Sequence, residues 1–490
     1  MPFRRPSYKA LHGSGHYRMW LAFVVFLSMT VCFPWQAAGI TVQEEEDLSR
    51  EFMKVVNQYY KVIKDPVIAA YVESVGQNLL TYFPPQPFKY NFYVIENEVY
   101  NAFASPAGKI FINSGLFAAM ESEEELAGIL SHEIAHASAR HVSQNIENSK
   151  KLNYATLAGL VAGVLLGVGG SAAAANAVTM GTMAAGQSLA LTFSRANEVQ
   201  ADQLGLLYLT QAGYTGEGLL KMLKKMRSKQ WFDSNQMPTY LSTHPGTEDR
   251  IIYIDAWLAS QTPRKTAVSV SPPNPPARFN KAHTRLLALY GEEETQLRLF
   301  GDAVNQAPDN PLNHYGYGLV LARAGRHKEA IAQLKIALHK NALDPDLLKE
   351  IGRIYYLDGR FDEALGVLNG AVSLAPNDPD GLFYLARTQM ELGQFQEAAA
   401  GLEALIKKSR DYTQAFYFLG ETYGKLGEIP LAHYNLGLHY LLKGDHKNAV
   451  FHLTRASKDI QDPRKKQEIE DILRKLNQMP KSDPSKPASG

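Results

Sequence analysis

Apolar residues recur at helical spacing along most of the chain, and two short runs of strand-forming residues interrupt this pattern. Helical periodicity covers 44–82 and ends at a cluster of three prolines. The runs 88–96 and 109–112 favour strands, because their side chains are mainly aromatic or β-branched. The pattern therefore predicts a small sheet among helices in the N-terminal half.

A second set of helices follows the predicted strands. Ser122 and Glu125 have the spacing of a capping box, which predicts a helix from there to about Gln144. Apolar spacing also predicts helices at about 195–211, 216–229 and 248–260.

The C-terminal part of the chain repeats with a period of 34 residues. This period is typical of tetratricopeptide repeats, in which pairs of helices stack into a solenoid. Gly444 and Ala449 restate the signature only 17 residues after its last regular copy, so the end of the array departs from strict period, and a helix near 464–477 suits a cap. The regular positions are Gly291, Gly325, Gly359, Gly393 and Gly427, with Ala330, Ala364, Ala398 and Ala432.

Five prolines within 261–277 predict an extended linker between two domains. We expect the first domain over 39–260 and the repeat domain over 278–477, followed by a disordered tail over 478–490. The expected fold class is mostly α: an α+β domain with a small sheet, then an all-α repeat solenoid.

Composition narrows the chemistry that the chain can perform. Its 490 residues are 45% hydrophobic, which argues against a disordered chain and for two or three domains. The net charge is +1, so no global field would attract nucleic acid, and no nucleic-acid partner is expected. The single cysteine, Cys32, excludes a disulfide framework and a cysteine-ligated zinc site. Any metal must therefore be held by histidines and carboxylates.

The N-terminal segment has the parts of a secretory signal peptide. Basic residues precede an uncharged apolar run from Met19 to Phe33, and small residues follow it. The run is shorter than the about 20 residues of a membrane-spanning helix, although a retained anchor is the alternative. Cleavage near Ala38 would remove residues 1–38 and the only cysteine, so we expect an exported, cysteine-free mature chain.

His132-Glu133-Ile134-Ala135-His136 forms the pattern HExxH inside the helix predicted after Ser122. A spacing of i and i+4 places both imidazoles on one helix face, where they can bind a single zinc ion. Glu133 lies beside that site and can accept a proton from zinc-bound water. The bare pattern also occurs by chance, but a helical context with apolar flanks favours a functional site.

A catalytic zinc ion requires a third protein ligand and an open position. His141 is predicted to lie on the wrong side of the HExxH helix for this role. Glu198 is the better candidate, and Asp202 lies one turn further along the same face of the 195–211 helix. Asp202 could orient a ligand histidine or donate a proton, whereas the alternative makes both carboxylates solvated surface groups.

Together these motifs resemble the M48 family of metallopeptidases. The segments that carry the resemblance are HExxH, SRANEVQAD (194–202), STHP (242–245) and NAFA (101–104) with GKIFINSGL (108–116). The resemblance implies a zincin-like fold that binds one Zn²⁺ through His132, His136 and Glu198. It also implies that Glu133 is the general base and Asp202 an auxiliary acid. Finally, it implies that Ile110, Phe111 and Ile112 form a strand edge beside the cleft, where an extended substrate can pair through its backbone.

Two further features have alternative interpretations. His244 is either a surface or structural histidine, or a fourth zinc ligand that silences the enzyme until its loop moves; the M48 pattern includes this His-Pro pair. Residues 152–194 contain no charge and are rich in glycine and alanine. They form either a helical lid over the cleft or buried helices, or else a hairpin that dips into a membrane and makes peripheral contact with it.

An exported M48-like domain with C-terminal repeats is similar to family members of the bacterial periplasm. The resemblance implies a zinc endopeptidase in quality control and assembly of outer-membrane β-barrel proteins, either free in the periplasm or associated with the outer membrane. Its repeats would recruit unfolded or stalled outer-membrane proteins or the β-barrel assembly machinery. The alternatives are a periplasmic chaperone or scaffold with a largely silenced protease site, and a repeat adaptor with a chance HExxH.

Overall fold

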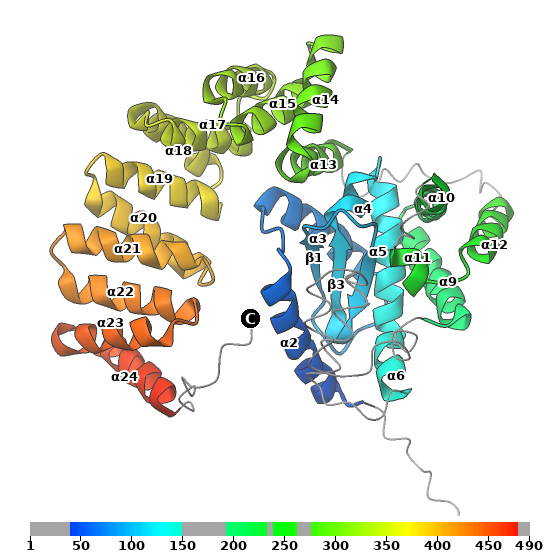
Figure 1. Ribbon diagram of the computed structural model, residues 1–490, viewed down its shortest axis with the longest axis horizontal. Coiled ribbons are helices and arrows are strands. Elements are labelled where there is room, and N and C mark those ends of the chain that lie inside the picture. Colours follow the sequence, from blue (N-terminus) through cyan, green and yellow to red (C-terminus); the bar gives the residue numbers. More distant parts are fainter. Residues whose placement is uncertain (1–39, 149–192, 233–238, 262–275, 479–490) are drawn as a thin grey trace, which may run out of the picture.

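The computed structural model describes residues 40–148, 193–232, 239–261 and 276–478, which form an α+β unit followed by an arc of helix pairs (Figure 1). The predicted fold class is confirmed. The predicted signal peptide, nearly all of 152–194, most of the linker 261–277 and the tail after Gln478 lie outside the described residues. Within the described ranges, no helix combines the length and apolarity needed to cross a membrane.

A three-stranded sheet lies at the centre of the α+β unit. Its strands are β1 (Asn91–Ile95), β2 (Ala102–Ser105) and β3 (Lys109–Asn113), in the order β1-β3-β2. β3 runs parallel to β1 and antiparallel to β2. The strands predicted within 88–96 and 109–112 are therefore present, and β2 is an additional strand.

Ile110, Phe111 and Ile112 do not form a strand edge, contrary to what the resemblance implied. They lie on β3, which is hydrogen-bonded on both sides and fully buried. The reason is a tight turn, with Ala107 and Gly108 at positive φ, that folds the short strand β2 back along β3. On the other side, the outer edge of β1 pairs with the segment around Val62. Among the described residues, β2 is thus the edge strand without a second partner.

Helices cover both faces of the sheet. α2 (Val42–Tyr59) and α6 (His141–Asn148) pack on the face that carries Phe103 and Phe111. α3 (Pro66–Leu80) and α5 (Glu123–Ser138) pack on the opposite face, which presents alternate residues such as Val94 and Ile112. α9 (Arg195–Gln211) and α10 (Glu217–Phe232) then pack on α5. The short helices α4 (Ser114–Ala118), η1 (Pro106–Gly108) and α11 (Thr239–Thr243), together with α12 (Thr247–Ser260), complete the unit.

The HExxH helix differs from its prediction at both ends. The side chain of Ser122 makes no capping hydrogen bond, and the carboxylate of Glu125 pairs with Lys225 and accepts from the amide of Glu121 instead of capping the helix. The helix does not continue to Gln144, since α5 ends at Ser138 and Arg140 adopts a left-handed φ of 55°. A separate helix, α6, begins at the next residue, His141.

The repeats form helix pairs that stack into an arc whose concave side is turned toward the α+β unit (Figure 1). The 34-residue period is confirmed in the turns, where glycines such as Gly325 and Gly359 have positive φ, and in close packing such as Gly352 against Leu368. The irregular end arises because α22 packs against α21 through Leu436 and against α23 through Gly437. α24 then closes the array. The helices are α13 (Pro276–Tyr290), α14 (Glu293–Gln306), α15 (Pro311–Arg323), α16 (His327–Lys340), α17 (Pro345–Leu357), α18 (Phe361–Leu374), α19 (Pro379–Glu391), α20 (Phe395–Lys408), α21 (Thr413–Lys425), α22 (Ile429–Leu442), α23 (His446–Asp459) and α24 (Pro463–Gln478).

The helix α13 joins the two parts of the molecule. Phe279 of α13 packs against Tyr71 and Phe117 within the main core of the α+β unit. Further along α13, Arg285 pairs with Asp65 just before α3 at 2.6 Å and with Glu350 of α17 at 2.7 Å. All three charged groups are nearly buried, so the repeats are attached to the α+β unit through packed side chains as well as through the chain.

Candidate metal centre

The helices α5 and α9 approach each other closely because a glycine lies at their contact. A Cβ on Gly205 would lie 3.3 Å from the backbone of His132, closer than most side chains tolerate. Ser131 strengthens the contact, since its hydroxyl donates to the carbonyl of Gly205 at 2.8 Å. This packing brings Glu198 and Asp202 of α9 against the two histidines of α5.

The three residues predicted as metal ligands converge in space. His132 Nε2 and His136 Nε2 lie 3.0 Å apart. The Glu198 carboxylate lies 3.5 Å from the first nitrogen and 3.4 Å from the second. All three side chains are fully buried, so Glu198 is not a solvated surface group.

His244 completes this cluster from the loop between α11 and α12. Its Nδ1 lies 3.0 Å from Glu198 Oε1 and 3.5 Å from His132 Nε2. The ring stacks on Tyr240 at a centroid distance of 4.2 Å, and the residue is fully buried. His244 is therefore not a surface histidine, and it belongs to the same group of four side chains that could hold a metal ion.

The geometry of these four groups fits one tetrahedral metal ion. Two ligand atoms about 2.1 Å from a tetrahedral zinc ion are separated by about 3.4 Å, and the separations here fall between 3.0 and 3.5 Å for most pairs. His132 directs its other nitrogen, Nδ1, to Asp202 Oδ1 at 2.8 Å, so Nε2 is the nitrogen left to bind a metal ion. Imidazole nitrogens and a carboxylate that converge in a buried space are stabilised by a cation between them, because burying them unpaired costs free energy.

Asp202 is held by three partners. Besides His132, it accepts two hydrogen bonds from Arg250 at 2.8 Å and one from the hydroxyl of Tyr253. Although burial opposes ionisation, Arg250 and His132 hold the pKa of Asp202 well below its usual range. An ionised acceptor of this kind orients His132, which favours the first of the two roles considered for Asp202 over proton donation.

Glu133 lies next to the cluster without joining it. Its carboxylate is fully buried, and neither oxygen accepts a hydrogen bond from a described residue. His244 Nε2 is 3.8 Å from one of these oxygens. Burial raises the pKa of Glu133, which gives the carboxylate a basicity suited to accepting a proton.

Charge within the centre is balanced mainly by Arg250, which sequence reasoning missed. Burial opposes ionisation of Glu198, but its electrostatic interactions with His244 and Arg250 hold the pKa of this carboxyl well below its usual range. Burial holds the pKa of His136 well below its ordinary value, so this ligand is neutral. The available signal was an arginine on α12 at the same face as Ile251 and Ile254, a position that is otherwise apolar.

His141 is a second residue whose place the sequence did not indicate. It was predicted on the wrong side of the HExxH helix, but its Nδ1 lies 3.0 Å from His136 Nδ1 in a fully buried position. His141 is not among the four side chains that could hold a metal ion, as predicted, but its contact with His136 was not foreseen because the prediction assumed a continuous helix past Arg140. The sequence did not indicate a role for Phe193, whose ring covers that of His136 at a centroid distance of 4.0 Å.

The comparisons with known proteins match this arrangement of domain and repeats. The family "Peptidase family M48" matches residues 66–258, and tetratricopeptide repeat families match 297–345, 315–379 and 355–420. The chain therefore contains a peptidase family M48 domain followed by tetratricopeptide repeats, as the resemblance predicted.

Several proteins with assigned names are similar to parts of this chain. The beta-barrel assembly-enhancing protease of Yersinia pestis is 26% identical over 66% of this chain and 63% of its own length, and that of Escherichia coli K12 is 26% identical over 65% and 62%. The chain thus matches less than two thirds of the length of these relatives. The mitochondrial metalloendopeptidase OMA1 of Schizosaccharomyces pombe is 27% identical over 40% of this chain and 55% of its own. Among solved structures, the TPR protein YrrB is 24% identical, with a TM-score of 0.31 over 35% of this chain and 89% of that one.

Proposed function

We propose that this chain is a zinc-dependent endopeptidase that binds one Zn²⁺ through His132, His136 and Glu198. The observation that carries the proposal is the convergence of these three ligands beside Glu133, a buried carboxylate with no hydrogen-bond donor among the described residues. Zinc bound there would supply a Lewis acid and lower the pKa of a bound water to about 7.

The residues of the chain provide proton transfer and the orientation of the ligands. Glu133 accepts a proton from the water that attacks the peptide carbonyl and delivers it to the departing amine. Asp202 keeps His132 in the tautomer with a free Nε2, and Arg250 holds Asp202 and Glu198 in place. Burial of all these groups excludes bulk water from the hydrogen-bonded set.

The test is the substitution Glu133→Gln, which preserves shape but removes the base. We expect the variant to retain one zinc ion per chain and to lose cleavage of an unfolded protein substrate. Glu217→Gln, at an exposed position of α10, serves as the control and retains full activity. Undiminished cleavage by Glu133→Gln would overturn the assignment.

We infer that an extended substrate pairs with β2 instead of β3. β2 is an edge strand among the described residues, although its four residues are buried, and it packs against α5, which carries the HExxH motif. Pairing with a substrate therefore requires this edge to become accessible. Backbone pairing along such an edge recognises extended chains with little sequence preference. Ala104→Pro on β2 would remove one backbone donor, so a raised KM with intact zinc content is expected, whereas an unchanged KM would contradict the pairing.

We propose that the enzyme acts in the assembly and quality control of outer-membrane β-barrel proteins. The support is that its relatives are beta-barrel assembly-enhancing proteases, together with the predicted signal peptide over 1–38. Export to the periplasm, a place near the outer membrane and contact with the β-barrel assembly machinery belong to this proposal. The lid and membrane hypotheses for 152–194 stay predictions; flotation of the full chain with liposomes, with and without that segment, distinguishes them.

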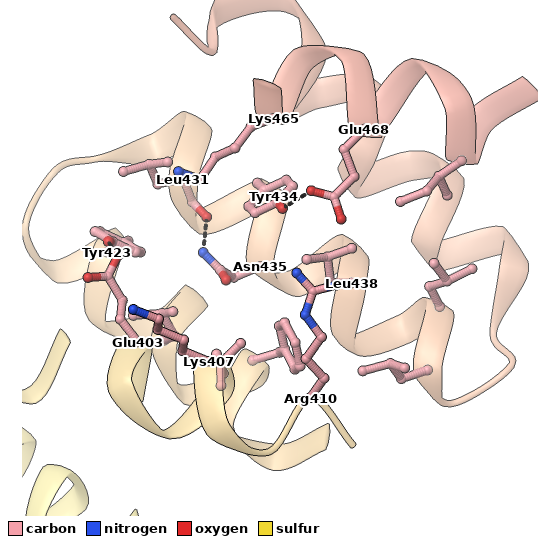
Figure 2. A pocket seen from close by; sticks show the side chains of 16 residues that line it. Glu403, Lys407, Arg410, Tyr423, Leu431, Tyr434, Asn435, Leu438, Lys465 and Glu468 are labelled. Carbon is pink, nitrogen blue, oxygen red and sulfur yellow. Dashed lines mark hydrogen bonds between the residues drawn. The ribbon is translucent and has the colours of Figure 1, made fainter. Parts of the chain in front are cut away.

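The repeats offer a pocket of about 460 Å³ for an unfolded client. α20, α21, α22 and α24 line it with apolar side chains such as Phe416, Leu419 and Leu438. Figure 2 shows the guanidinium of Arg410 directed into this pocket, between Asn435 and Leu438. The lining also carries three basic and two acidic side chains, so it suits apolar segments of an unfolded chain that are flanked by charged groups, acidic ones above all.

Two leucines provide a matched test of this client site. Leu442 lines the pocket and is 49% exposed, whereas Leu357 is 50% exposed on α17 and lies outside the pocket. Leu442→Asp should weaken binding of a fluorescent unfolded β-barrel protein severalfold, and Leu357→Asp should leave it unchanged. Equal binding by both variants would exclude the pocket as the client site.

A second candidate function is a periplasmic chaperone or scaffold with a silenced protease site. The observation that favours it is His244, whose Nδ1 lies within the ligand cluster and would fill the fourth zinc position. Complementation of a β-barrel assembly defect by Glu133→Gln would favour this scaffold, whereas failure would favour the enzyme.

A further inference from the structure

His141 reaches the candidate zinc ligands only because the backbone makes a strained turn at the residue before it. Arg140 has a φ of 55°, a conformation that residues with a Cβ rarely adopt. Its guanidinium donates to Glu45 Oε2 at 2.8 Å and to the carbonyl of Ile40 at 2.6 Å. Glu45 also accepts from the hydroxyl of Ser143 on α6. The N-terminal helix α2 therefore holds the break that separates α6 from α5.

The break brings His141 beneath His136. On a continuous helix, a residue five positions after His136 would point well away from it, yet the two Nδ1 atoms lie 3.0 Å apart. The second nitrogen of His141, Nε2, lies 3.0 Å from Gln200 Oε1 on α9. His141 thus connects a ligand histidine on one helix with an amide on another.

The acceptor at the far end fixes the direction of these hydrogen bonds. An amide oxygen only accepts, so His141 donates from Nε2–H to Gln200 Oε1. Nδ1 of the neutral His141 ring is then an acceptor, and His136 must donate from Nδ1–H to it. His136 is left with a lone pair on Nε2, the atom that lies 3.0 Å from His132 Nε2 in the ligand cluster.

We propose that His141 is a positioning residue that keeps His136 in the tautomer and orientation that bind zinc. Its part corresponds to that of Asp202, which accepts from Nδ1 of the other ligand, His132. Partners of this kind typically change metal affinity by 10- to 100-fold when they are removed. The inference rests on the zinc site proposed above, and it adds Gln200 and the Arg140 turn as the elements that hold His141.

Two substitutions of His141 separate hydrogen bonding from packing. His141→Leu keeps a branched side chain of similar extent but removes the acceptor, whereas His141→Asn places an amide oxygen near the position of Nδ1. We expect His141→Leu to bind Zn²⁺ about 10- to 100-fold more weakly than the wild-type chain in competition with a chelator, and His141→Asn to remain within about threefold. In the Co²⁺-loaded protein, the visible absorption band should shift in the leucine variant and be retained in the asparagine variant.

A second buried histidine provides the control for folding. His314 in the repeats lies 2.6 Å from Gln333 Oε1 and 2.7 Å from the carbonyl of Pro308, so it has the same number of partners as His141. His314→Leu should lower Tm without changing zinc affinity. Circular dichroism of each metal-free variant verifies that the fold is retained.

Each outcome bears on one proposal. Wild-type affinity in His141→Leu, or an equal loss in His141→Asn and His141→Leu, would overturn the positioning role. Absence of zinc from the wild-type chain would instead overturn the proposed function, and the two failures are therefore distinguishable.

Discussion

Nη1 of Arg250 lies 2.7 Å from Glu198 Oε2, although both side chains are buried among the metal-binding groups. The same guanidinium also engages Asp202 through Nε. One cation therefore faces two carboxylates, one a candidate ligand and the other the partner of a ligand. Arginine suits this place because its planar fork can donate in two directions at once.

Replacing Arg250 should destabilise the metal-free chain. Arg250→Met leaves two buried carboxylates without their cation, and breaking a buried pair costs about 3–5 kcal/mol. We expect a loss of that size in the free energy of unfolding, measured by urea denaturation in the presence of a chelator. Arg195→Met, which breaks an exposed pair with Asp249, should cost less than about 1 kcal/mol. Equal losses in the two variants would contradict the special place of Arg250.

His244 should restrain proteolysis if it occupies the fourth zinc position. His244→Ala frees that position, and we expect cleavage of an unfolded protein to rise on the order of tenfold, which corresponds to about 1.4 kcal/mol for displacing the imidazole. His446→Ala, at an exposed position on α23, is the control. Activity that is unchanged or lower in His244→Ala would instead indicate a structural histidine.

Zinc affinity should increase with pH because His132 has to lose a proton before it binds metal. Burial and Arg250 disfavour that proton, but Asp202 and Glu198 outweigh them and raise the pKa of His132 to about 9 in the metal-free chain. Zinc affinity measured by competition should therefore rise by up to tenfold per pH unit until about pH 9. Affinity that is constant between pH 6.5 and 9 would show that His132 is already neutral.

The same shift affects the stability of the metal-free chain. A histidine whose pKa is raised on folding contributes stability that is complete below its unfolded value of about 6.5 and is lost as the pH passes its folded value. The Tm of the metal-free chain should thus fall between pH 6.5 and about 9. With zinc bound, His132 carries no proton on Nε2, and this part of the decline should disappear.

Arg285 should hold the repeats against the peptidase domain. Arg285→Met leaves Asp65 and Glu350 without their shared cation, and we expect a loss of about 3–5 kcal/mol in stability. Small-angle scattering should show a broader distribution of distances between the two parts, while zinc affinity stays unchanged. Arg326→Met, which breaks a surface pair with Glu329, is the control. An unchanged scattering profile would assign the connection to the apolar contacts of Phe279 alone.

The sequence predicted those parts of the molecule that depend on regular spacing. The helix at 195–211 was predicted with its observed bounds, and its face carries Glu198 and Asp202 against HExxH. The repeats followed from glycines at fixed intervals, since those glycines occupy left-handed turns.

Features that depend on tertiary contacts were not predicted. β2 is only four residues long and mostly small, so it lacked the aromatic and β-branched signal of a strand. The break at Arg140 contains no glycine or proline that would have indicated it in the sequence. Contacts of Arg140 with α2 and the residue Ile40 before it stabilise the break instead. β2 explains why Ile110–Ile112 are not at a sheet edge, and the break at Arg140 explains why the contact of His141 with His136 was not foreseen. Arg250 was missed because only the folded chain brings its partners together.

The helix α13 makes the proline-rich segment a poor place to divide the protein. The segment 261–277 separates two sequence patterns, but Phe279 and Leu286 of α13 belong to the core that also contains Ile129 and Leu130 of the HExxH helix α5. Cutting there would deprive the peptidase core of one wall and expose its apolar side chains to water. We therefore expect the two parts to unfold together as one cooperative unit, because α13 contributes to the packing of both.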